Sequence, residues 1–223
     1  IDVYGMGSEQ LRDAGANLLI DCSDIAVVGL VEVIANYRKI VSALNILKES
    51  LRNDPPDLLI LVDYQEFNFK LAETAKQLGI KVLFYIGPQV WAWRQHRVHK
   101  IGKRIDMMAV ILPFEEKFYE DANVPVRFVG NPLVDEAKPN RDKQSCLNDY
   151  QLNTNSQIVG LFPGSRRSEI KRVLPIQLAA AEKLLEQQAD LQFVLPIAST
   201  LSKDAFSDCL EKYSHLNVKL VKD

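Results

Sequence analysis

The chain has 223 residues, 47% of them hydrophobic and 25% charged, so it can bury a core without disulfide or metal support. A net charge of -2 argues against a general nucleic-acid-binding protein, which would be strongly basic. The three cysteines and three histidines lack metal-ligand spacing, so we expect free thiols and no metal site. No apolar run approaches the roughly 20 residues needed to span a bilayer.

Short apolar runs alternate with helical patterns along the chain. The predicted strands are residues 58–62, 82–86, 107–111, 126–129, 158–162, 193–197 and 218–221. The predicted helices are residues 31–51, 69–78, 113–123, 145–150, 175–188 and 202–213. Strands that are apolar on both faces and separated by helices predict an α/β fold with parallel sheets and right-handed connections.

A polar stretch around Pro139 interrupts this alternation between residues 134 and 156. It has no apolar periodicity, which is typical of a boundary between domains. We therefore predict two α/β domains, residues 1–137 and 138–223. The first residue is Ile1 and the chain ends directly after a strand-like run, so we expect both ends to be incomplete.

The first predicted helix belongs to an apolar stretch, residues 26–41, that carries Arg38 and Lys39 near its middle. A buried core helix is one explanation of this pattern. An apolar helix that touches a membrane and is flanked by cations is the other. In the second explanation, the residues that touch the membrane are Val31, Val33, Ile34, Tyr37, Ile40 and Val41.

The predicted strand 58–62 ends at Asp63, and Glu66 and Asn68 lie on the loop that follows. Ligands of open parallel sheets bind at the carboxyl ends of the strands. A carboxylate at this place could act as a general base toward a hydroxyl group, or bind a ribose or sugar hydroxyl. Asp63 or Asn68 could equally cap the helix that begins at residue 69.

The next strand runs into the segment IGPQVWAWR, residues 86–94. Its two tryptophans and Arg94 could stack on a sugar or base and bind a phosphate, with Trp93 next to the arginine. The tryptophans could also be core residues. Cations recur every three residues from Arg94 to Lys103 on a predicted helix, where they could meet lipid phosphates or form a solvated basic face.

In the second domain, a strand opens into the loop Pro163, Gly164, Ser165, Arg166, which enters a helix through Ser168. Backbone N–H groups at such a helix start bind anions, and the guanidinium of Arg166 suits a diphosphate. The loop matches neither the Walker A nor the GxGxxG pattern. An ordinary turn with a capping serine would also explain it.

Several of these segments together resemble the lipid-A-disaccharide synthase family in order and spacing. They are VVGLVEVI at 27–34, PDLLILVDYQEFN at 56–68, GPQVWAWRQHRVHKI at 87–101, LPFEEKFY at 112–119, VRFVGNPLVD at 126–135 and LFPGSRRSEI at 161–170. The resemblance runs through nearly the whole chain. It implies a GT-B fold with two Rossmann-like domains: an acceptor-side, membrane-side domain and a partial nucleotide-sugar-binding domain.

The resemblance further implies inverting glycosyl transfer without a metal or cofactor. The donor would be UDP-2,3-diacylglucosamine, the acceptor 2,3-diacylglucosamine 1-phosphate, and the products a β-1,6-linked lipid A disaccharide phosphate and UDP. The enzyme would be cytoplasmic and peripheral on the inner face of the bacterial inner membrane, with no nucleic-acid partner; a homodimer remains open.

Carried onto this sequence, the resemblance gives Asp63 as the catalytic base. The residues it implies in substrate binding are Asn68, Trp93, Arg94, Gly164, Ser165, Arg166 and Glu169. Two positions depart from the family pattern: Gly87 stands where serine is usual, and Glu66 where Asp or Gly is frequent. The family's first strand with its loop, and its later donor-binding loop, are expected outside this chain.

The mechanism that follows is a hypothesis. Asp63 would take the proton of the acceptor 6-hydroxyl as that oxygen attacks the donor's anomeric carbon, while Arg166 and the amides of 164–167 would stabilise the leaving UDP. Asp63 and Arg166 would then face each other across the cleft between the domains. Two alternatives stay open: another GT-B enzyme such as a UDP-N-acetylglucosamine 2-epimerase, and an inactive fragment that binds a membrane or a partner.

Overall fold

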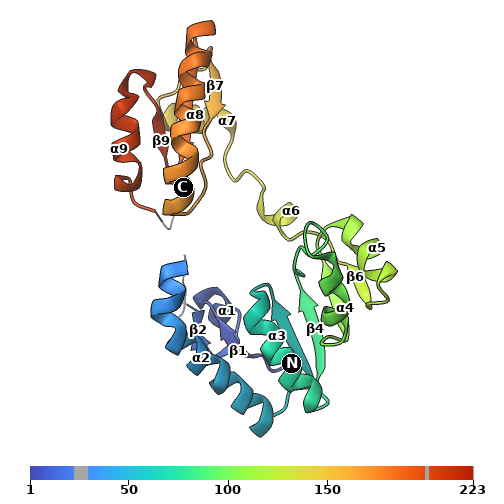
Figure 1. Ribbon diagram of the computed structural model, residues 1–223. Helices are drawn as coiled ribbons and strands as arrows, with labels where there is room; N and C mark the ends of the chain where they lie inside the picture. Colours follow the sequence, from blue (N-terminus) through green and yellow to red (C-terminus); the bar gives the residue numbers. More distant parts are fainter. Residues whose placement is uncertain (23–29, 199–200, 223) are drawn as a thin grey trace. The chain divides into compact units, whose positions relative to one another are not determined.

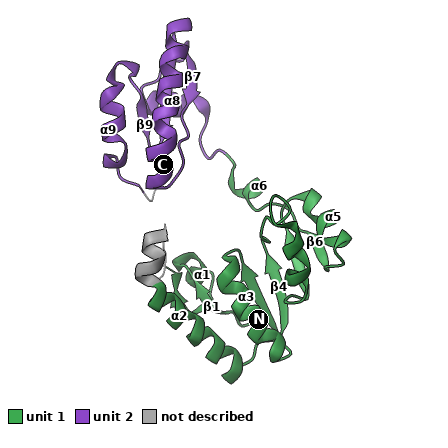
Figure 2. Ribbon diagram, viewed as in Figure 1, with its two compact units in different colours: residues 1–138 green, residues 139–223 purple. Residues whose placement is uncertain are grey.

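The structure is a computed structural model that describes residues 1–22, 30–198 and 201–222, with the side chains of 30–36 outside the description. The chain divides into two compact units, residues 1–138 and 139–223 (Figure 2). Both units consist of parallel strands and helices, so the predicted α/β class is confirmed.

The first unit contains two parallel sheets (Figure 1). Four strands pair in the order β3-β4-β5-β6, with bounds Leu58–Val62, Lys81–Tyr85, Met107–Val110 and Val126–Phe128. Two further strands, Tyr4–Gly7 (β1) and Asn17–Asp21 (β2), pair with each other. The helices of this unit are α1 Glu9–Asp13, α2 Leu30–Asn53, α3 Gln65–Gln77, η2 Gln95–Arg97, α4 Val98–Gly102, α5 Pro113–Asp121 and α6 Leu133–Glu136.

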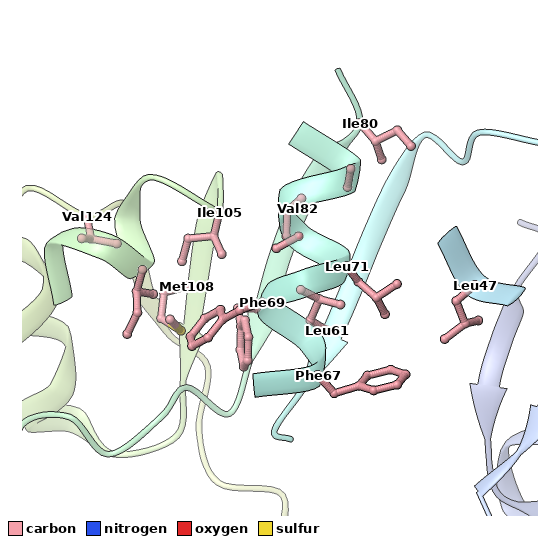
Figure 3. Packing of buried hydrophobic residues seen from close by; sticks show 14 of the residues in the cluster. Leu47, Leu61, Phe67, Phe69, Leu71, Ile80, Val82, Ile105, Met108 and Val124 are labelled. Carbon is pink, nitrogen blue, oxygen red and sulfur yellow. The ribbon is translucent and has the colours of Figure 1, made fainter. Parts of the chain in front are cut away.

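The core of the first unit lies between the four-stranded sheet and its helices (Figure 3). Helix α3 buries Phe67, Leu71 and Ala75, which recur every four residues and therefore form one face. The Phe69 ring packs at 5.5 Å from the ring of Phe84 on β4. Because β3 and β4 are fixed against this helix, the turns at their carboxyl ends have a rigid base.

The second unit has the sheet order β7-β8-β9, with bounds Gln157–Gly160, Leu191–Pro196 and Lys219–Val221. Its helices are α7 Lys143–Asp149, α8 Arg167–Gln187, α9 Asp204–Lys212 and η3 Ser214–Leu216. Helix α8 buries one stripe, Ile170, Leu174, Leu178 and Ala181, in the cluster that also contains Phe193 of β8. This packing fixes the start of α8 next to the end of β7.

Every strand predicted from the sequence is present, with bounds within about two residues. The prediction missed β1 and β2. In β1, Gly5 and Gly7 weaken the apolar alternation that marks a strand, and in β2 only three apolar residues stand between Asn17 and Asp21. The two strands are held by their hydrogen bonds to each other, and the local sequence of either segment does not predict this pairing.

Two helix predictions were wrong at their starts, and a third helix does not form as predicted. Helix α8 begins eight residues before Pro175, which lies inside it, because the buried stripe continues across the proline. Helix α3 begins at Gln65 instead of residue 69. The basic series from Arg94 is not one helix: Arg94 has a left-handed backbone, φ 73°, and only the short elements η2 and α4 follow.

The three cysteines are free thiols, as expected. Within the described residues, no helix combines the length and the apolar character that crossing a membrane requires.

Asp106, just before β5, joins α3 to the sheet. Its carboxylate accepts hydrogen bonds from Lys76 Nζ and from the backbone N–H of Val82, both at 2.9 Å. Desolvation raises the pKa of Asp106, but the bonds from Lys76 and Val82 outweigh it and hold the pKa below its ordinary value. A carboxyl with a depressed folded-state pKa contributes stability above its unfolded pKa of about 3.9 and loses it as the pH falls further.

We expect Asp106→Asn to lower the free energy of unfolding by about 1 kcal/mol at pH 7, because a charged acceptor is lost. The difference from the wild type should shrink as the pH falls below about 4. Urea denaturation between pH 3 and pH 7 measures it. Asp121→Asn, which affects only an exposed pair with Lys117, is the control and should change stability little at any pH.

Candidate active site

The turn between β3 and α3 presents Asp63 at the carboxyl end of the sheet. Val62 pairs with Tyr85, and the N–H of Asp63 extends the ladder to the Tyr85 carbonyl at 3.3 Å. Asp63 and Tyr64 then both adopt left-handed backbones, with φ of 47° and 34°. Consecutive non-glycine residues in this region are unfavourable unless the surroundings impose them. The Asp63 side chain is exposed.

Asn68 imposes this backbone. Its side-chain amide nitrogen donates to the carbonyl oxygens of Val62, at 3.0 Å, and Asp63, at 2.8 Å. The side chain is only 7% exposed, and the ring of Tyr64 stacks on that of Phe67 at 5.4 Å. The structure therefore places Asn68 beneath the turn, where it fixes the position of Asp63 through the backbone.

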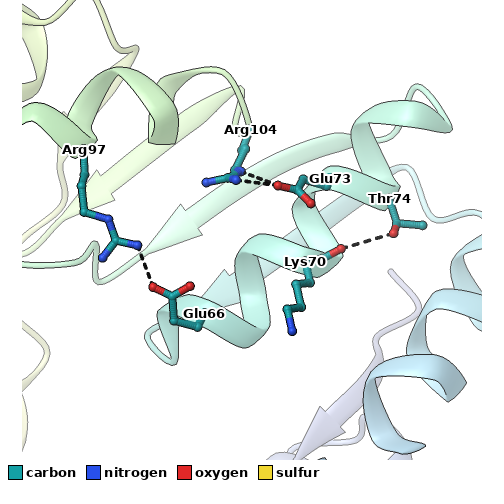
Figure 4. Close-up of polar contacts among 6 residues, drawn as sticks. All are labelled: Glu66, Lys70, Glu73, Thr74, Arg97 and Arg104. Atoms are coloured by element: carbon teal, nitrogen blue, oxygen red, sulfur yellow. Dashed lines mark hydrogen bonds and ion pairs between the residues drawn. The ribbon is translucent and has the colours of Figure 1, made fainter. Parts of the chain in front are cut away.

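The second carboxylate of this turn, Glu66, is engaged. The guanidinium of Arg97 donates to Glu66 Oε1 at 2.6 Å (Figure 4). This hydrogen bond, assisted by the positive charges nearby, lowers the pKa of Glu66 and makes it a weaker proton acceptor. The Asp63 carboxylate, by contrast, has no hydrogen bond or ion pair to the residues that the structure describes. Asp63 is therefore the carboxylate available to a ligand.

The loop after β4 is fastened to helix α5 through Trp91. The indole Nε1 donates to Glu115 Oε1 at 3.0 Å, and the ring meets that of Phe114 edge-on at 4.8 Å. Glu115 is 2% exposed, and its other oxygen accepts the N–H of Leu112 at 3.1 Å. The loop segment and the PFEEKFY segment, distant in sequence, thus form one structure. Trp91 has a packing role.

A hydrogen bond also fixes the start of the loop after β4. The buried hydroxyl of Tyr119 donates to the Pro88 carbonyl at 3.1 Å. Burial and the charge of Glu115 raise the Tyr119 pKa, so the hydroxyl stays a donor. A Cβ at Gly87 would lie 2.6 Å from Met108 Sδ and 3.1 Å from the Tyr119 oxygen. A larger residue at position 87 would therefore require the Met108 side chain to shift.

Trp93 and Arg94 are presented outward by this anchored loop. Trp93 is 62% exposed, and the Arg94 guanidinium lies 4.4 Å from its ring centroid. An exposed aromatic ring with a cation beside it can stack on a sugar or base and bind an anion. Because β3 and β4 are parallel neighbours, Asp63 and this loop leave the sheet at the same edge.

In the second unit, the loop between β7 and α8 holds an internal anion. Glu169 Oε2 accepts the N–H groups of Ser165, at 2.9 Å, and Arg166, at 3.2 Å. Its other oxygen lies 3.2 Å from the Arg166 guanidinium. Two of the loop amides predicted to bind a ligand anion are thus occupied by a carboxylate of the chain itself, and their binding of a ligand stays a prediction.

The contact with Glu169 limits which amides a ligand can use. A ligand phosphate that binds the amides of Ser165 and Arg166 has to displace Glu169. The next two N–H groups, of Arg167 and Ser168, have no acceptor in the part of the chain that the structure describes. The sequence carried a signal for the contact, because a glutamate three residues after a helix N-cap is typical of a capping box.

The residues predicted to touch a membrane divide into three groups. The side chains of Val31, Val33 and Ile34 lie outside the described residues. Tyr37 is 60% exposed, whereas Ile40 and Val41 are half-buried and Ile40 packs against the core cluster. This part of α2 therefore has both an exposed and a core-facing side.

Among residues 1–22, 30–198 and 201–222, no group of three or more histidine, cysteine or acidic side chains is arranged to hold a metal. The charged and polar groups of the two loops are the candidates for ligand binding.

A family model described as lipid-A-disaccharide synthetase matches residues 1–223. The chain belongs to this family. Lipid-A-disaccharide synthase of Trichlorobacter lovleyi is 53% identical over 208 residues, which are 93% of this chain and 54% of the relative. The Geobacter sulfurreducens synthase is 46% identical over 223 residues, all of this chain and 58% of the relative. The chain thus spans little more than half the length of these synthases.

The fold of this chain is similar to that of several solved structures. The Neisseria meningitidis UDP-GlcNAc 2-epimerase bound to UDP-GlcNAc has a TM-score of 0.62 at 13% identity, covering 100% of this chain and 72% of that one. The Staphylococcus aureus MnaA-UDP structure has a TM-score of 0.61 at 12% identity, covering 100% and 68%. At these identities the likeness shows the fold alone, which is the GT-B type of UDP-sugar enzymes. The synthetase family match is therefore what separates this chain from the epimerases.

Gly164 is required by the Glu169 contact. Its φ is 112°, and an added Cβ would lie 2.3 Å from Glu169 Oε2 and 2.8 Å from Glu169 Cβ. We expect Gly164→Ala to destabilise the second unit by about 1–3 kcal/mol, from backbone strain and this collision. In a Glu169→Ala background the cost should be smaller, because the collision with the Glu169 carboxylate is removed and only the backbone strain and the contact with the Cβ of residue 169 remain. Equal costs in the two backgrounds, measured by urea denaturation, would contradict the contact.

Proposed function

We propose that the protein is a glycosyltransferase of lipid A biosynthesis. It would condense UDP-2,3-diacylglucosamine with 2,3-diacylglucosamine 1-phosphate, giving lipid A disaccharide phosphate and UDP. The observation that carries the proposal is the family match over the entire chain. Release of UDP from the two lipid substrates by the purified protein is the direct test, and no release above a boiled control would reject it.

Asp63 is the proposed general base. Its carboxylate is exposed and unengaged within the described chain, and its backbone is held by Asn68. A single base suits an inverting displacement: the acceptor 6-hydroxyl loses its proton to Asp63 while its oxygen bonds to the anomeric carbon and UDP leaves. Arg97 weakens Glu66 as a competing base.

The β7–α8 loop is the proposed site of the donor diphosphate. Gly164 lets the backbone turn, the N–H groups at the start of α8 can donate to the diphosphate, and the Arg166 guanidinium adds a full positive charge. Glu169 keeps the loop in shape until the diphosphate arrives and then gives up the amides of Ser165 and Arg166. These groups would stabilise the negative charge that develops on the leaving UDP.

Trp93 and Arg94 are proposed to contact the substrate at the same sheet edge as Asp63. Membrane association through α2, on the cytoplasmic face of the inner membrane, is a further part of the proposal. The exposed ring of Tyr37 and the neighbouring Arg38 and Lys39, also exposed, support it, because aromatic and cationic side chains favour a membrane interface. A homodimer is left open.

An inactive fragment that still binds a membrane or a partner is the second candidate. The observation that favours it is the coverage of only 54–58% of the two synthases compared above. The UDP-release assay separates the two candidates, because a fragment of this kind would associate with lipid without turnover.

The base assignment predicts that Asp63→Asn lowers kcat by at least about 100-fold, since a positioned base contributes that much or more. The KM for both substrates should change little. Asp57→Asn is the matched control: it is an exposed aspartate at the opposite end of β3 and should keep wild-type turnover. Near-normal kcat in Asp63→Asn would remove Asp63 from the chemistry.

The donor-site assignment predicts that Arg166→Ala raises the donor KM or lowers kcat about tenfold, because one charge-assisted contact to the diphosphate is lost. The acceptor KM should be unaffected. Arg172→Ala changes an exposed arginine farther along α8 and serves as the control. Unchanged donor kinetics in Arg166→Ala would exclude Arg166 from the diphosphate site.

A further inference from the structure

A charged groove runs between α3 and the η2–α4 segment, and Asp63 is not among its lining residues. It has a volume of about 290 Å³. The buried side chains of Phe69 and Ile101 contribute apolar lining. The remaining lining residues are charged: Glu66, Lys70 and Glu73 from α3, and Arg97, Lys100 and Arg104 from the other side.

Two ion pairs fix the arginines of this groove (Figure 4). Arg97 bonds Glu66 at 2.6 Å, and Arg104 bonds Glu73 Oε1 through Nε at 2.8 Å and Nη2 at 2.5 Å. The Arg104 guanidinium also lies 5.3 Å from the Phe69 ring centroid. Both guanidinium groups are therefore oriented before any ligand binds, which reduces the entropy that binding costs.

The groove has more cations than anions. Two carboxylates face four cations, which leaves a surplus of two positive charges. Lys70 and Lys100 have no ion pair with any residue in the described ranges. Arg97 uses one guanidinium N–H group and Arg104 two, out of five each, so further donors remain. These charges and donors suit an anion with several acceptor oxygens.

A phosphate monoester meets this requirement. It carries a charge of about -1.5 to -2 at pH 7 and three acceptor oxygens. Guanidinium groups match its geometry, and lysine supplies mobile point charges. The apolar lining would accommodate the carbon skeleton next to the phosphate.

The groove begins beside the proposed base. Glu66 lies in the first turn of α3, and that helix starts two residues after Asp63. Lys70 is four residues further along the helix, about 6 Å along the axis. Arg97 lies three residues after Arg94. A molecule with a hydroxyl group at Asp63 could therefore extend a phosphate toward Lys70 and Lys100.

We propose that this groove binds the phosphate group of a lipid, and that the phosphate is that of the sugar 1-phosphate whose hydroxyl reacts at Asp63. The choice of this lipid rests on the proposed function; the anion site itself rests on the groove. The headgroup of an anionic membrane lipid offers the same chemistry, and the experiment distinguishes the two sources.

The first measurement is binding of glucosamine 1-phosphate to the protein by calorimetry, with glucosamine as the phosphate-free probe. We expect Lys70→Gln/Lys100→Gln to weaken binding of the phosphate about tenfold, because two charge-assisted contacts are lost. Lys103→Gln/Lys117→Gln removes the same charge from exposed positions outside the groove and should change the Kd by no more than about twofold. Equal effects of the two double variants would overturn the proposal.

The second measurement identifies the source of the phosphate. If the acceptor supplies it, the groove variant raises the acceptor KM in neutral detergent and leaves kcat and the donor KM unchanged. If a membrane lipid supplies it, the variant instead loses flotation with phosphatidylglycerol vesicles at an unchanged acceptor KM, which overturns the assignment to the acceptor. Lys70→Arg/Lys100→Arg should restore binding in either case.

The calorimetric result does not depend on turnover. A wild-type protein that releases no UDP but binds glucosamine 1-phosphate in the groove would reject the proposed function and retain the anion site. A wild-type protein that turns over but binds the phosphate no better than glucosamine would reject the groove and retain the function.

Discussion

The amide of Asn68 holds two carbonyl oxygens at the end of β3, and the candidate active site depends on these bonds. They fix a turn in which Asp63 and Tyr64 both have positive φ. Without these bonds, an extended or right-handed backbone would have the lower free energy, and it would point the Asp63 side chain in another direction. The buried amide thus converts the packing of α3 on the sheet into a defined position for an exposed carboxylate.

Carboxylates at helix starts fix the other two loops in a similar way. Glu115 in the first turn of α5 holds the N–H of Leu112 and the indole of Trp91. Glu169 in the first turn of α8 holds the amides of Ser165 and Arg166. In both places the helix N-terminus favours a negative charge, and a single side chain secures the chain before the helix. The two carboxylates differ in exposure: Glu115 is 2% exposed, whereas Glu169 is half-buried, which is consistent with the proposal that a ligand anion replaces it.

Much of the fold could be predicted from the sequence because a buried strand is apolar on both faces and a parallel sheet needs helices between its strands. The segments 58–62 and 107–110 show this directly. The start of helix α8 could not be predicted in this way, because Pro175 locally disfavours a helix. Leu174 and Leu178, on either side of the proline, are nevertheless fully buried. Packing free energy outweighed the local preference there. The approach of Asp63 to Arg166, which lie in different units, stays a prediction.

The sequence by itself determined the fold class, the family and the places where polar side chains follow strands, because each of these depends on patterns along a contiguous segment. Only the tertiary structure decided which of those side chains are available. Asn68 and Trp91 are engaged inside the protein, Glu66 is paired with an arginine from another element, and Asp63 is left exposed. The physical reason is that a hydrogen bond or ion pair between segments depends on distances in space, which the local sequence does not encode.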